Sequence, residues 1–315
     1  MINGMINVYK EAGFTSHDVV AKLRGILKQK KIGHTGTLDP QAVGVLPVCL
    51  GNATKLCDLF VDKTKEYEAV LRLGVTTDTQ DLTGTVLTER PVAVGPEKAE
   101  EVLLSFLGEY AQIPPMYSAL KVNGQKLYDL ARQGKEIERT ARAVTIYKMD
   151  IQEIALPVIR FKVSCSKGTY IRTLCHDIGA KLGCGGAMES LKRTAAGSFQ
   201  AEDALTLAQI EELRDRGKIM DAVLPVEKIF ESYDKVFAVR TATAMLQNGN
   251  VLNKRQINRR EAADAGKDTF QISVNGRGEL VRMYDVKESF YGVYEYLETE
   301  GLYKPYKMFL PDMEA

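Results

Sequence analysis

Residues 33–51, GHTGTLDPQAVGVLPVCLG, form the stretch of the chain that says most about its fold. Its glycines and its two prolines predict loop and short strand in place of a regular helix. Asp39 stands directly before Pro40, which restricts the aspartate to extended backbone. A carboxylate on such a loop is a candidate catalytic group, because glycines let the backbone approach a ligand closely. By itself, an Asp-Pro pair more often marks only the start of a turn.

The segments on either side of this stretch predict strands and helices in mixed order. Before it, Thr15 is placed to cap a helix whose apolar stripe runs from Val19 to Leu27 and ends in lysines. Because the chain shows no regular strand–helix–strand repeat, the expected fold class is α+β. Strands are expected at Glu66–Leu73, Val144–Ile154 and Val158–Cys165, and further helices at Pro96–Phe106 and Tyr170–Leu182.

Changes in composition and sequence pattern along the chain predict its division into domains. Residues 113–142 have the character of an insertion, with a turn at Asn123-Gly124 followed by a basic helix. After Pro225 three segments predict a small β-rich module: Met245–Val251, Phe270–Val274 and Leu280–Met283. We therefore expect one domain of residues 1–231, carrying an insertion at about 112–143, and a module of residues 232–315.

The composition is that of a folded protein without a membrane span. Of 315 residues, 45% are hydrophobic and 26% are charged, which suffices for one large and one small domain with buried cores. The chain has no apolar run of about 18 residues and no secretory h-region. Its five cysteines form no C-x-x-C pair, so free thiols in a reducing compartment, the cytoplasm, are expected.

Positive charge gathers in three stretches, although the net charge is only +1. Taken alone, each stretch is most simply a solvated helix face. Three of them in a near-neutral chain favour a surface for RNA or DNA. The stretches are Lys22–Lys31, Lys121–Arg142 and Lys254–Arg260.

The motifs of several other chemistries are missing from the sequence. It contains no G-x-x-x-x-G-K-[ST] phosphate loop, no dinucleotide fingerprint after a strand and no G-x-S-x-G elbow. Its histidines, His17, His34 and His176, do not have the spacing of a metal site. No metal or cofactor is therefore expected.

Seven motifs, in the same order, resemble those of the bacterial tRNA pseudouridine synthase B family (TruB). Residues 33–51 are similar to the catalytic motif of that family, in which an aspartate precedes a proline. The chain departs from the family at Glu11, where proline is usual, and this bears on the geometry at Lys10. The other matching motifs are Asn7–Lys10 with Gly13–Ser16, Lys65–Tyr67, Leu73–Gly84, Ile113–Lys121, Ser166–Arg172 and Leu191–Phe199.

The resemblance implies a fold and a function. The fold would be a pseudouridine-synthase domain with a mixed, largely antiparallel central sheet flanked by helices, followed by a PUA-like RNA-binding module. The function would be isomerisation of uridine-55 in the tRNA T-loop to pseudouridine by base flipping, with a further role as a tRNA-folding chaperone. The partner would be the T-arm stem-loop of tRNA, bound by a cytoplasmic monomer that needs no other protein and no cofactor.

The resemblance also implies roles for individual residues. Asp39 would be the catalytic carboxylate, and Arg172 would lie against it and keep it ionised. Tyr67 would stack on the uracil and take the C5 proton. The residues implied to bind the substrate are His34, Tyr170, Leu191, Lys10 and Lys121.

Several alternatives stay open at this point. Asp39 would act by attack on C1′, by attack on C6 or by removal of the C2′ proton, and the sequence does not choose among these routes. The same scaffold would also serve a non-catalytic RNA-binding or chaperone protein. A third reading is a synthase that modifies ribosomal RNA within a guide complex, which usually brings basic tails that this chain lacks.

Overall fold

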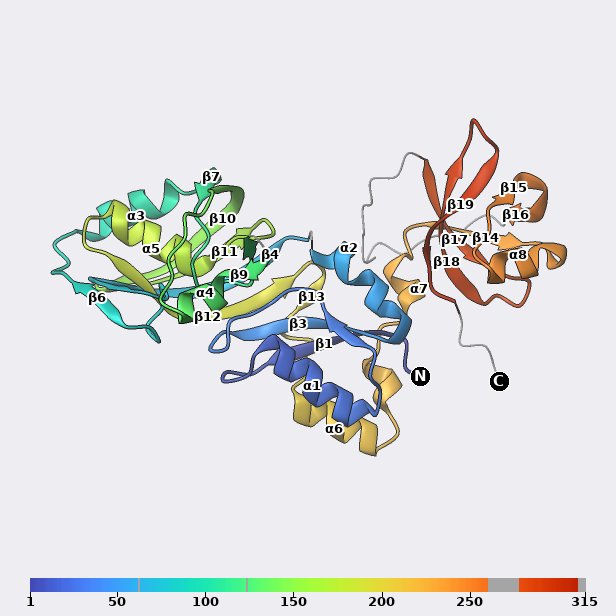
Figure 1. The fold of residues 1–315 in the computed structure, drawn as a ribbon, viewed down its shortest axis with the longest axis horizontal. Coiled ribbons are helices and arrows are strands. Elements are labelled where there is room, and N and C mark those ends of the chain that lie inside the picture. Colours follow the sequence, from blue (N-terminus) through green and yellow to red (C-terminus); the bar gives the residue numbers. More distant parts are fainter. Residues whose placement is uncertain (62, 123, 260–277, 311–315) are drawn as a thin grey trace.

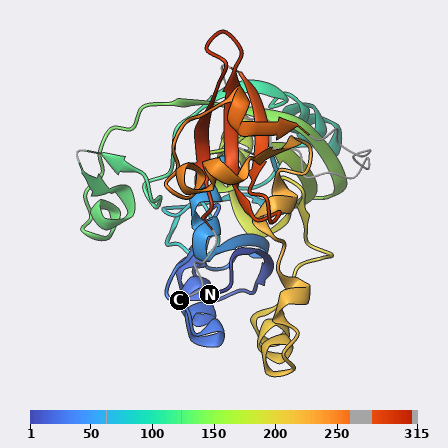
Figure 2. The same ribbon diagram turned by 90° about the vertical axis from the view of Figure 1, so that its right-hand side faces the viewer.

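The structure of the chain is a computed structural model that describes residues 1–61, 63–122, 124–259 and 278–310. Its described residues form a large body and a smaller C-terminal body, each built on its own β-sheet (Figure 1). Figure 2 turns the molecule so that the C-terminal sheet faces the viewer, with the large body behind and below it. Mixed sheets flanked by helices confirm the predicted α+β class.

The large body is built on a nine-stranded sheet with the order β1-β3-β12-β4-β11-β10-β7, in which β2 also pairs with β3 and β13 with β12. Only the β3–β12 pairing is parallel among the described pairings of this sheet, so the expected largely antiparallel sheet is confirmed. The strands are β1 (Gly4–Lys10), β2 (Ile32–His34), β3 (Val43–Leu50), β4 (Lys65–Leu73), β7 (Gly108–Gln112), β10 (Arg142–Ala155), β11 (Val158–Cys165), β12 (Gly186–Ala196) and β13 (Phe199–Gln200).

Strand β3 corrects the prediction of loop and short strand for residues 33–51. It spans eight residues, and all of them except Val43 are buried. Val45 and Cys49 pack into one apolar cluster, while Leu46 and Leu50 pack into another. A strand covered on both faces reads as a continuous apolar run, without the alternation that identifies a strand from sequence. The loop of this region is therefore only residues 35–42.

Two pairs of helices cover the large sheet. Helices α3 and α5 lie over its left part in Figure 1, and α1 and α6 lie below strands β1 and β3 at its other end. Helix α1 begins as predicted. The Thr15 hydroxyl accepts a hydrogen bond from the Asp18 amide, and the Asp18 carboxylate accepts one from the Thr15 amide. None of the described helices has the length and apolar character needed to cross a membrane. The helices are α1 (Ser16–Leu27), α2 (Cys57–Val61), α3 (Pro96–Leu104), α4 (Leu127–Arg132), α5 (Ile171–Lys181), α6 (Leu207–Asp215), α7 (Val226–Ile229) and α8 (Thr243–Gln247).

Two small hairpins project from the large body. One pairs β5 (Val75–Thr77) with β6 (Val86–Glu89). The other belongs to the insertion between β7 and β10, where β8 (Lys121–Val122) pairs with β9 (Gln125–Lys126) and leads into α4. The insertion has its own apolar cluster around Met116, Leu127 and Leu130. The predicted turn at Asn123-Gly124 falls between β8 and β9, but Asn123 lies outside the described residues.

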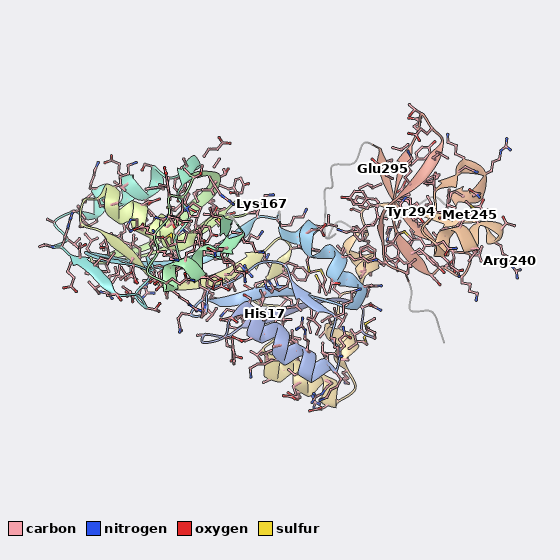
Figure 3. The ribbon with its side chains drawn as sticks, in the orientation of Figure 1. His17, Lys167, Arg240, Met245, Tyr294 and Glu295 are labelled. Atoms are coloured by element: carbon pink, nitrogen blue, oxygen red, sulfur yellow. The ribbon has the colours of Figure 1, made fainter. Side chains whose placement is uncertain are left out.

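The C-terminal body is a six-stranded sheet with the order β15-β19-β18-β17-β14-β16. The predicted strand Leu280–Met283 lies within β17, whereas the predicted strand Phe270–Val274 and Arg260 of the third basic stretch lie outside the described residues. Figure 3 shows Arg240, Met245, Tyr294 and Glu295 together in this body, apart from His17 and Lys167 of the large body. The strands are β14 (Asp234–Ala238), β15 (Leu252–Asn253), β16 (Ile257–Arg259), β17 (Glu279–Tyr284), β18 (Phe290–Leu297) and β19 (Leu302–Met308).

Apolar and polar contacts join the two bodies. Val293 and Phe309 belong to the same buried cluster as Met5 and Leu56 of the large body. The Lys307 ammonium lies 2.6 Å from the Asp58 carboxylate, and Lys55 donates to the carbonyl oxygen of Met308 at 2.9 Å. The C-terminal sheet is therefore packed against the outer end of the large sheet.

Candidate active site

The loop that carries Asp39 lies between β2 and β3 and is fixed by neighbours on both sides. The Leu38 amide donates to Ser16 Oγ at 2.9 Å, which ties the loop to the first turn of α1. Lys10 Nζ donates to the carbonyl oxygen of Pro40 at 2.9 Å. Arg193 Nη2 donates to the carbonyl oxygen of Gly36 at 3.2 Å. The backbone before and after Asp39 is thus held by three side chains from α1, β1 and β12.

Lys10 is completely buried, although the sequence predicted that it binds the substrate. Its ammonium donates to the carbonyl oxygens of Phe14, Pro40 and Glu11, at 2.6, 2.9 and 3.1 Å. An ammonium has three donors, so none is left for RNA in this arrangement. Burial lowers the pKa of Lys10 from 10.5 to about 8, and the nearby charge of Asp39 opposes this shift. Glu11 offers only its backbone carbonyl here, so its side chain does not enter this contact.

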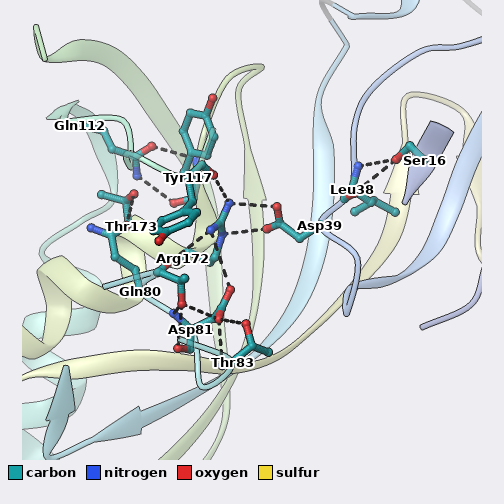
Figure 4. A network of polar contacts seen from close by, with 12 residues as sticks. Ser16, Leu38, Asp39, Gln80, Asp81, Thr83, Gln112, Tyr117, Arg172 and Thr173 are labelled. Atoms are coloured by element: carbon teal, nitrogen blue, oxygen red, sulfur yellow. Dashed lines mark hydrogen bonds and ion pairs between the residues drawn. The ribbon is translucent and has the colours of Figure 1, made fainter. Parts of the chain in front are cut away.

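Asp39 and Arg172 form a two-point ion pair. Arg172 Nε lies 2.8 Å from Asp39 Oδ2, and Arg172 Nη2 donates to Asp39 Oδ1 at 2.9 Å. Only 6% of the Arg172 side chain is exposed, against 34% for Asp39, so the carboxylate keeps one open side. Figure 4 shows the guanidinium fork facing the carboxylate. The Nη2 contact is a hydrogen bond and the Nε contact is an ion pair, and together they fix the orientation as well as the charge of the carboxylate.

The charge state of Asp39 depends on opposing effects. Burial raises the pKa of the Asp39 carboxyl above its usual value, the charge and hydrogen bond of Arg172 lower it, and the neighbouring carboxylate of Asp81 raises it. The arginine therefore partly offsets the cost of burying the ionised acid. A carboxyl whose pKa is perturbed by burial together with a specific charged partner is typical of a functional site.

Arg172 is held by three further acceptors that the sequence did not reveal. It donates to the carbonyl oxygens of Thr79 at 3.1 Å and Tyr117 at 2.9 Å, and it lies 3.8 Å from the Asp81 carboxylate. Asp81 is fixed in turn by Thr83, whose hydroxyl and amide donate to it at 2.6 and 3.0 Å (Figure 4). In the sequence, Asp81 lies within the matching motif Leu73–Gly84, but nothing there singled it out.

Tyr67 and Arg193 are cross-strand neighbours on β4 and β12. Both side chains are buried, and Arg193 is only 2% exposed. Burial raises the pKa of the Tyr67 hydroxyl, whereas the charge and hydrogen bonding of Arg193 lower it. The same guanidinium donates to the carbonyl oxygen of Val45 at 2.7 Å. The sequence placed Arg193 in a matching motif but did not single it out.

The remaining predicted residues divide into those near Asp39 and one that is remote. Leu191 is buried in the same cluster as Tyr67 and Leu38. Tyr170 is half-buried directly before α5. Burial raises the pKa of both Tyr67 and Tyr170, and the charge of Asp39 adds to the shift in each, so the three groups lie within electrostatic reach. Lys121 is exposed on β8 of the insertion, and none of the hydrogen bonds and ion pairs of the described residues links it to Asp39 or Arg172.

His34 ends β2, next to the loop of Asp39. It is half-buried and pairs with Val48 of β3. Burial lowers the pKa of His34, and the positive charges of Arg193 and His17 lower it further. Its Nδ1 has no hydrogen-bond partner within the described part of the chain. The side chain is thus a neutral imidazole with an unused polar atom at the edge of the site.

Comparison with known proteins identifies relatives along nearly the whole chain. Residues 24–171 match the N-terminal domain of the TruB family of pseudouridylate synthases, and residues 172–231 match the C-terminal domain of tRNA pseudouridylate synthase B. The tRNA pseudouridine synthase B of Lachnoclostridium phytofermentans is 53% identical over 317 residues, which cover 98% of this chain and 100% of that protein. The protein of the same name from Latilactobacillus sakei is 40% identical, and the match covers 98% of each.

Two solved structures with a similar fold are chains of larger complexes. A chain in a Cbf5-Nop10-Gar1 complex has a TM-score of 0.68 at 30% identity. A chain in an H/ACA RNP bound to a substrate RNA containing 2′-deoxyuridine has the same TM-score at 28% identity. Each match covers 98% of this chain and 85% of the other. The similarity therefore includes both bodies of the fold.

Proposed function

This chain belongs to the TruB family of pseudouridylate synthases, and from this premise we infer that it isomerises uridine to pseudouridine in tRNA. The reaction breaks the bond between C1′ of the ribose and N1 of the uracil and forms a bond between C1′ and C5. The C5 proton leaves and N1 gains a proton, so no atom and no electron is added overall. The enzyme is an isomerase.

We propose that Asp39 is the catalytic carboxylate, and the observation that carries this proposal is its two-point ion pair with Arg172. Each of the three open routes begins with an ionised acid beside the glycosidic bond. Arg172 favours the ionised form and fixes the direction in which the carboxylate points. The exposed part of the Asp39 side chain offers the approach for the ribose.

We propose that the flipped uracil lies between Tyr67, Tyr170 and Leu191. The rings offer stacking surfaces, and Leu191 supplies an apolar wall in the cluster that also contains Tyr67. Tyr67 would receive the C5 proton: burial raises the pKa of its hydroxyl overall, and the Arg193 guanidinium opposes this by favouring the ionised form that accepts a proton. A base within a folded RNA loop has to leave its stack to reach such a pocket. His34, neutral and with a free Nδ1, would occupy the gap it leaves.

We propose uridine-55 of the T-loop as the target and the T-arm as the bound element, as the resemblance of the motifs to the family implies; the name that the relatives carry supports tRNA as the substrate class. The basic insertion with Lys121 would grip the phosphates, and Lys10 would support the Asp39 loop in place of direct RNA contact. The division into residues 1–231 and a PUA-like module of residues 232–315 fits the start of the second sheet at Asp234.

The setting of the enzyme is also a proposal. We expect a monomer that needs no other protein, in contrast to the complexes in which the Cbf5 chains were solved. The relatives at 40–53% identity carry the name of a tRNA enzyme, which favours this reading over a guide-directed synthase. All five cysteines are free, which agrees with the cytoplasm as the compartment.

Tritium release tests the proposed function. A tRNA transcript with uridine labelled by tritium at C5 is incubated with the wild type and with Asp39→Asn, without added metal or cofactor. We expect release from the wild type and none above background from the variant, with equal tRNA binding by both. Tight tRNA binding without release by the wild type would instead support the RNA-binding or chaperone alternative.

A further inference from the structure

The side-chain amide of Gln112 holds both backbone groups of Tyr170. Its Oε1 accepts from the Tyr170 amide at 2.8 Å, and its Nε2 donates to the Tyr170 carbonyl oxygen at 3.0 Å. The same Nε2 also donates to the Tyr110 hydroxyl. Gln112 is only 1% exposed, so these contacts are shielded from water. An amide that pairs with a peptide unit on both sides fixes its position and its orientation.

The peptide held in this way is the start of the helix that carries Arg172. Tyr170 is the residue before α5 and has no side-chain cap of its own. Arg172 follows two residues later, in the first helical turn, where its guanidinium meets Asp39. Helix ends fray most easily, so a buried tether at Tyr170 limits movement of this turn. Gln112 thereby acts on two groups of the site: the Tyr170 ring and the Arg172 guanidinium.

The same tether marks the point where the insertion leaves the sheet. Gln112 is the last residue of β7, and the chain continues into the insertion from there. Five residues later the carbonyl oxygen of Tyr117 accepts from Arg172 Nη2 at 2.9 Å. The first segment of the insertion is thus attached to the start of α5 at both ends (Figure 4). A pull on the insertion by bound RNA would reach Arg172 through these contacts.

We propose that Gln112 is a positioning residue that sets the start of α5, and with it the Arg172–Asp39 ion pair, for the reaction. This inference rests on the proposed function, because it assumes that the ionised Asp39 reacts. None of the hydrogen bonds described for Gln112 goes to the Asp39 carboxylate, and those to Tyr170 go to its backbone and not to the ring that would face the uracil. Its loss should therefore slow the chemical step and leave RNA affinity nearly unchanged.

Gln112→Met tests the proposal, because methionine has a similar shape but cannot pair with the Tyr170 peptide. The single-turnover rate of pseudouridine formation is measured on a saturating tRNA transcript between pH 5 and pH 9, beside the tRNA Kd and the melting temperature. Tyr110→Phe is the matched control, since it removes one partner of the amide and keeps both bonds to Tyr170 and the ring contact with Phe106. Gln112→Glu, which keeps the acceptor and loses the donor, replaces the methionine variant if that variant does not fold.

We expect Gln112→Met to lower the rate by about tenfold or more, with a Kd within about twofold of the wild type. The decline of the rate at low pH (the acid limb of the pH profile) should move to higher pH. The reason is that a less firmly held Arg172 opposes protonation of Asp39 less well. The charged groups that face Asp39 are Arg172 from α5, Asp81 from the turn after β5 and Lys10 from β1, and only the first is released by the variant.

Two results would overturn the inference. One is a Gln112→Met variant that has the same rate as the wild type and the same decline in rate at low pH. The other is a rate loss with an unmoved acid limb, or with an equal loss in Tyr110→Phe, which would mean a general effect on packing. Absence of pseudouridine formation by the wild type would instead refute the proposed function, so the two failures are told apart within one experiment.

Discussion

Arg172 and Asp39 lie 133 residues apart in the chain, yet their side chains meet in a two-point ion pair at 2.8 and 2.9 Å. The arginine is nearly buried and has three other acceptors in Thr79, Tyr117 and Asp81. Its position is therefore set by several parts of the fold, and the carboxylate aligns to it. The carboxylate proposed to react is thus oriented before any RNA binds, which would lower the cost of organising the site during the reaction.

Replacement of Tyr67 by phenylalanine separates stacking from proton transfer. Tyr67→Phe keeps the ring, so tRNA binding should be unchanged, but the variant has no hydroxyl to accept the C5 proton. We expect tritium release from C5-labelled tRNA to fall by roughly 10²–10⁴-fold, the usual contribution of a positioned acid or base. Tyr147→Phe, which alters an exposed tyrosine of β10, serves as the control and should behave as the wild type. Full release by Tyr67→Phe would remove the hydroxyl from the mechanism.

The buried ammonium of Lys10 predicts a loss of activity at alkaline pH. Its pKa is lowered to about 8 by burial, so the folded protein loses this proton at a lower pH than the unfolded chain does. Between about pH 8 and 10.5 deprotonation therefore adds to stability, but it removes one donor from the carbonyls of Glu11, Phe14 and Pro40. The Asp39 loop then loosens, and the rate should decline above pH 8.

Lys10→Met tests this account through the single-turnover rate between pH 6.5 and pH 9.5. The variant should be slower than the wild type at neutral pH, because the loop carbonyls lose their donor, and its rate should be level across pH 8. Lys98→Met, at a surface residue of α3 that pairs with Glu101, should keep the wild-type profile. Persistence of the alkaline limb in Lys10→Met would assign that limb to another group.

Sequence patterns within a few residues predicted those helices and strands whose stability depends on residues close by in the chain. The cap at Thr15 and the apolar stripe from Val19 to Leu27 identified α1, because both depend on residues within one or a few helical turns. The length of β3 was not predictable in the same way, since burial on both faces removes the alternation of a strand. The length of β3 depends on packing against both of its faces, and the sequence does not show that packing.

The candidate site shows the same difference between features visible in the local sequence and contacts made across the fold. Asp39 and Arg172 were identified through motifs that resemble a known family, whereas the local chemistry of an Asp-Pro pair indicated only a turn. Arg193 escaped notice because its partners, Gly36 and Val45, lie 157 and 148 residues away. A contact between a buried guanidinium and two distant carbonyl groups leaves no trace in the spacing of residues. Gln112 and Asp81 were missed for the same reason.

Arg193 should be essential for stability as well as for the position of Tyr67. Arg193→Met leaves the carbonyl oxygens of Val45 and Gly36 buried without a donor. Each such group costs about 1–3 kcal/mol, so urea unfolding followed by circular dichroism should show a loss of roughly 2–5 kcal/mol. Arg160→Met, at an exposed arginine of β11 paired with Glu153, should change stability by less than about 1 kcal/mol. Equal stabilities of the two variants would show that Arg193 does not hold the loop.

Charge on the insertion should determine how strongly tRNA binding responds to salt. Lys121 and Lys135 are exposed and lie on either side of α4, in the segment proposed to grip phosphates. Binding releases fewer counterions from the RNA when a phosphate contact is lost. The slope of log affinity against log salt should therefore fall in magnitude by about 0.7–0.9 for each contact removed. The double variant Lys121→Ala/Lys135→Ala is compared with the wild type by filter binding at several salt concentrations, and Lys98→Ala provides the control. At saturating tRNA the double variant should keep the wild-type rate, because neither lysine contacts the Asp39–Arg172 pair. An unchanged salt slope would place the phosphate contacts elsewhere on the molecule, and an unchanged slope with a reduced rate would give the insertion a role in the chemical step.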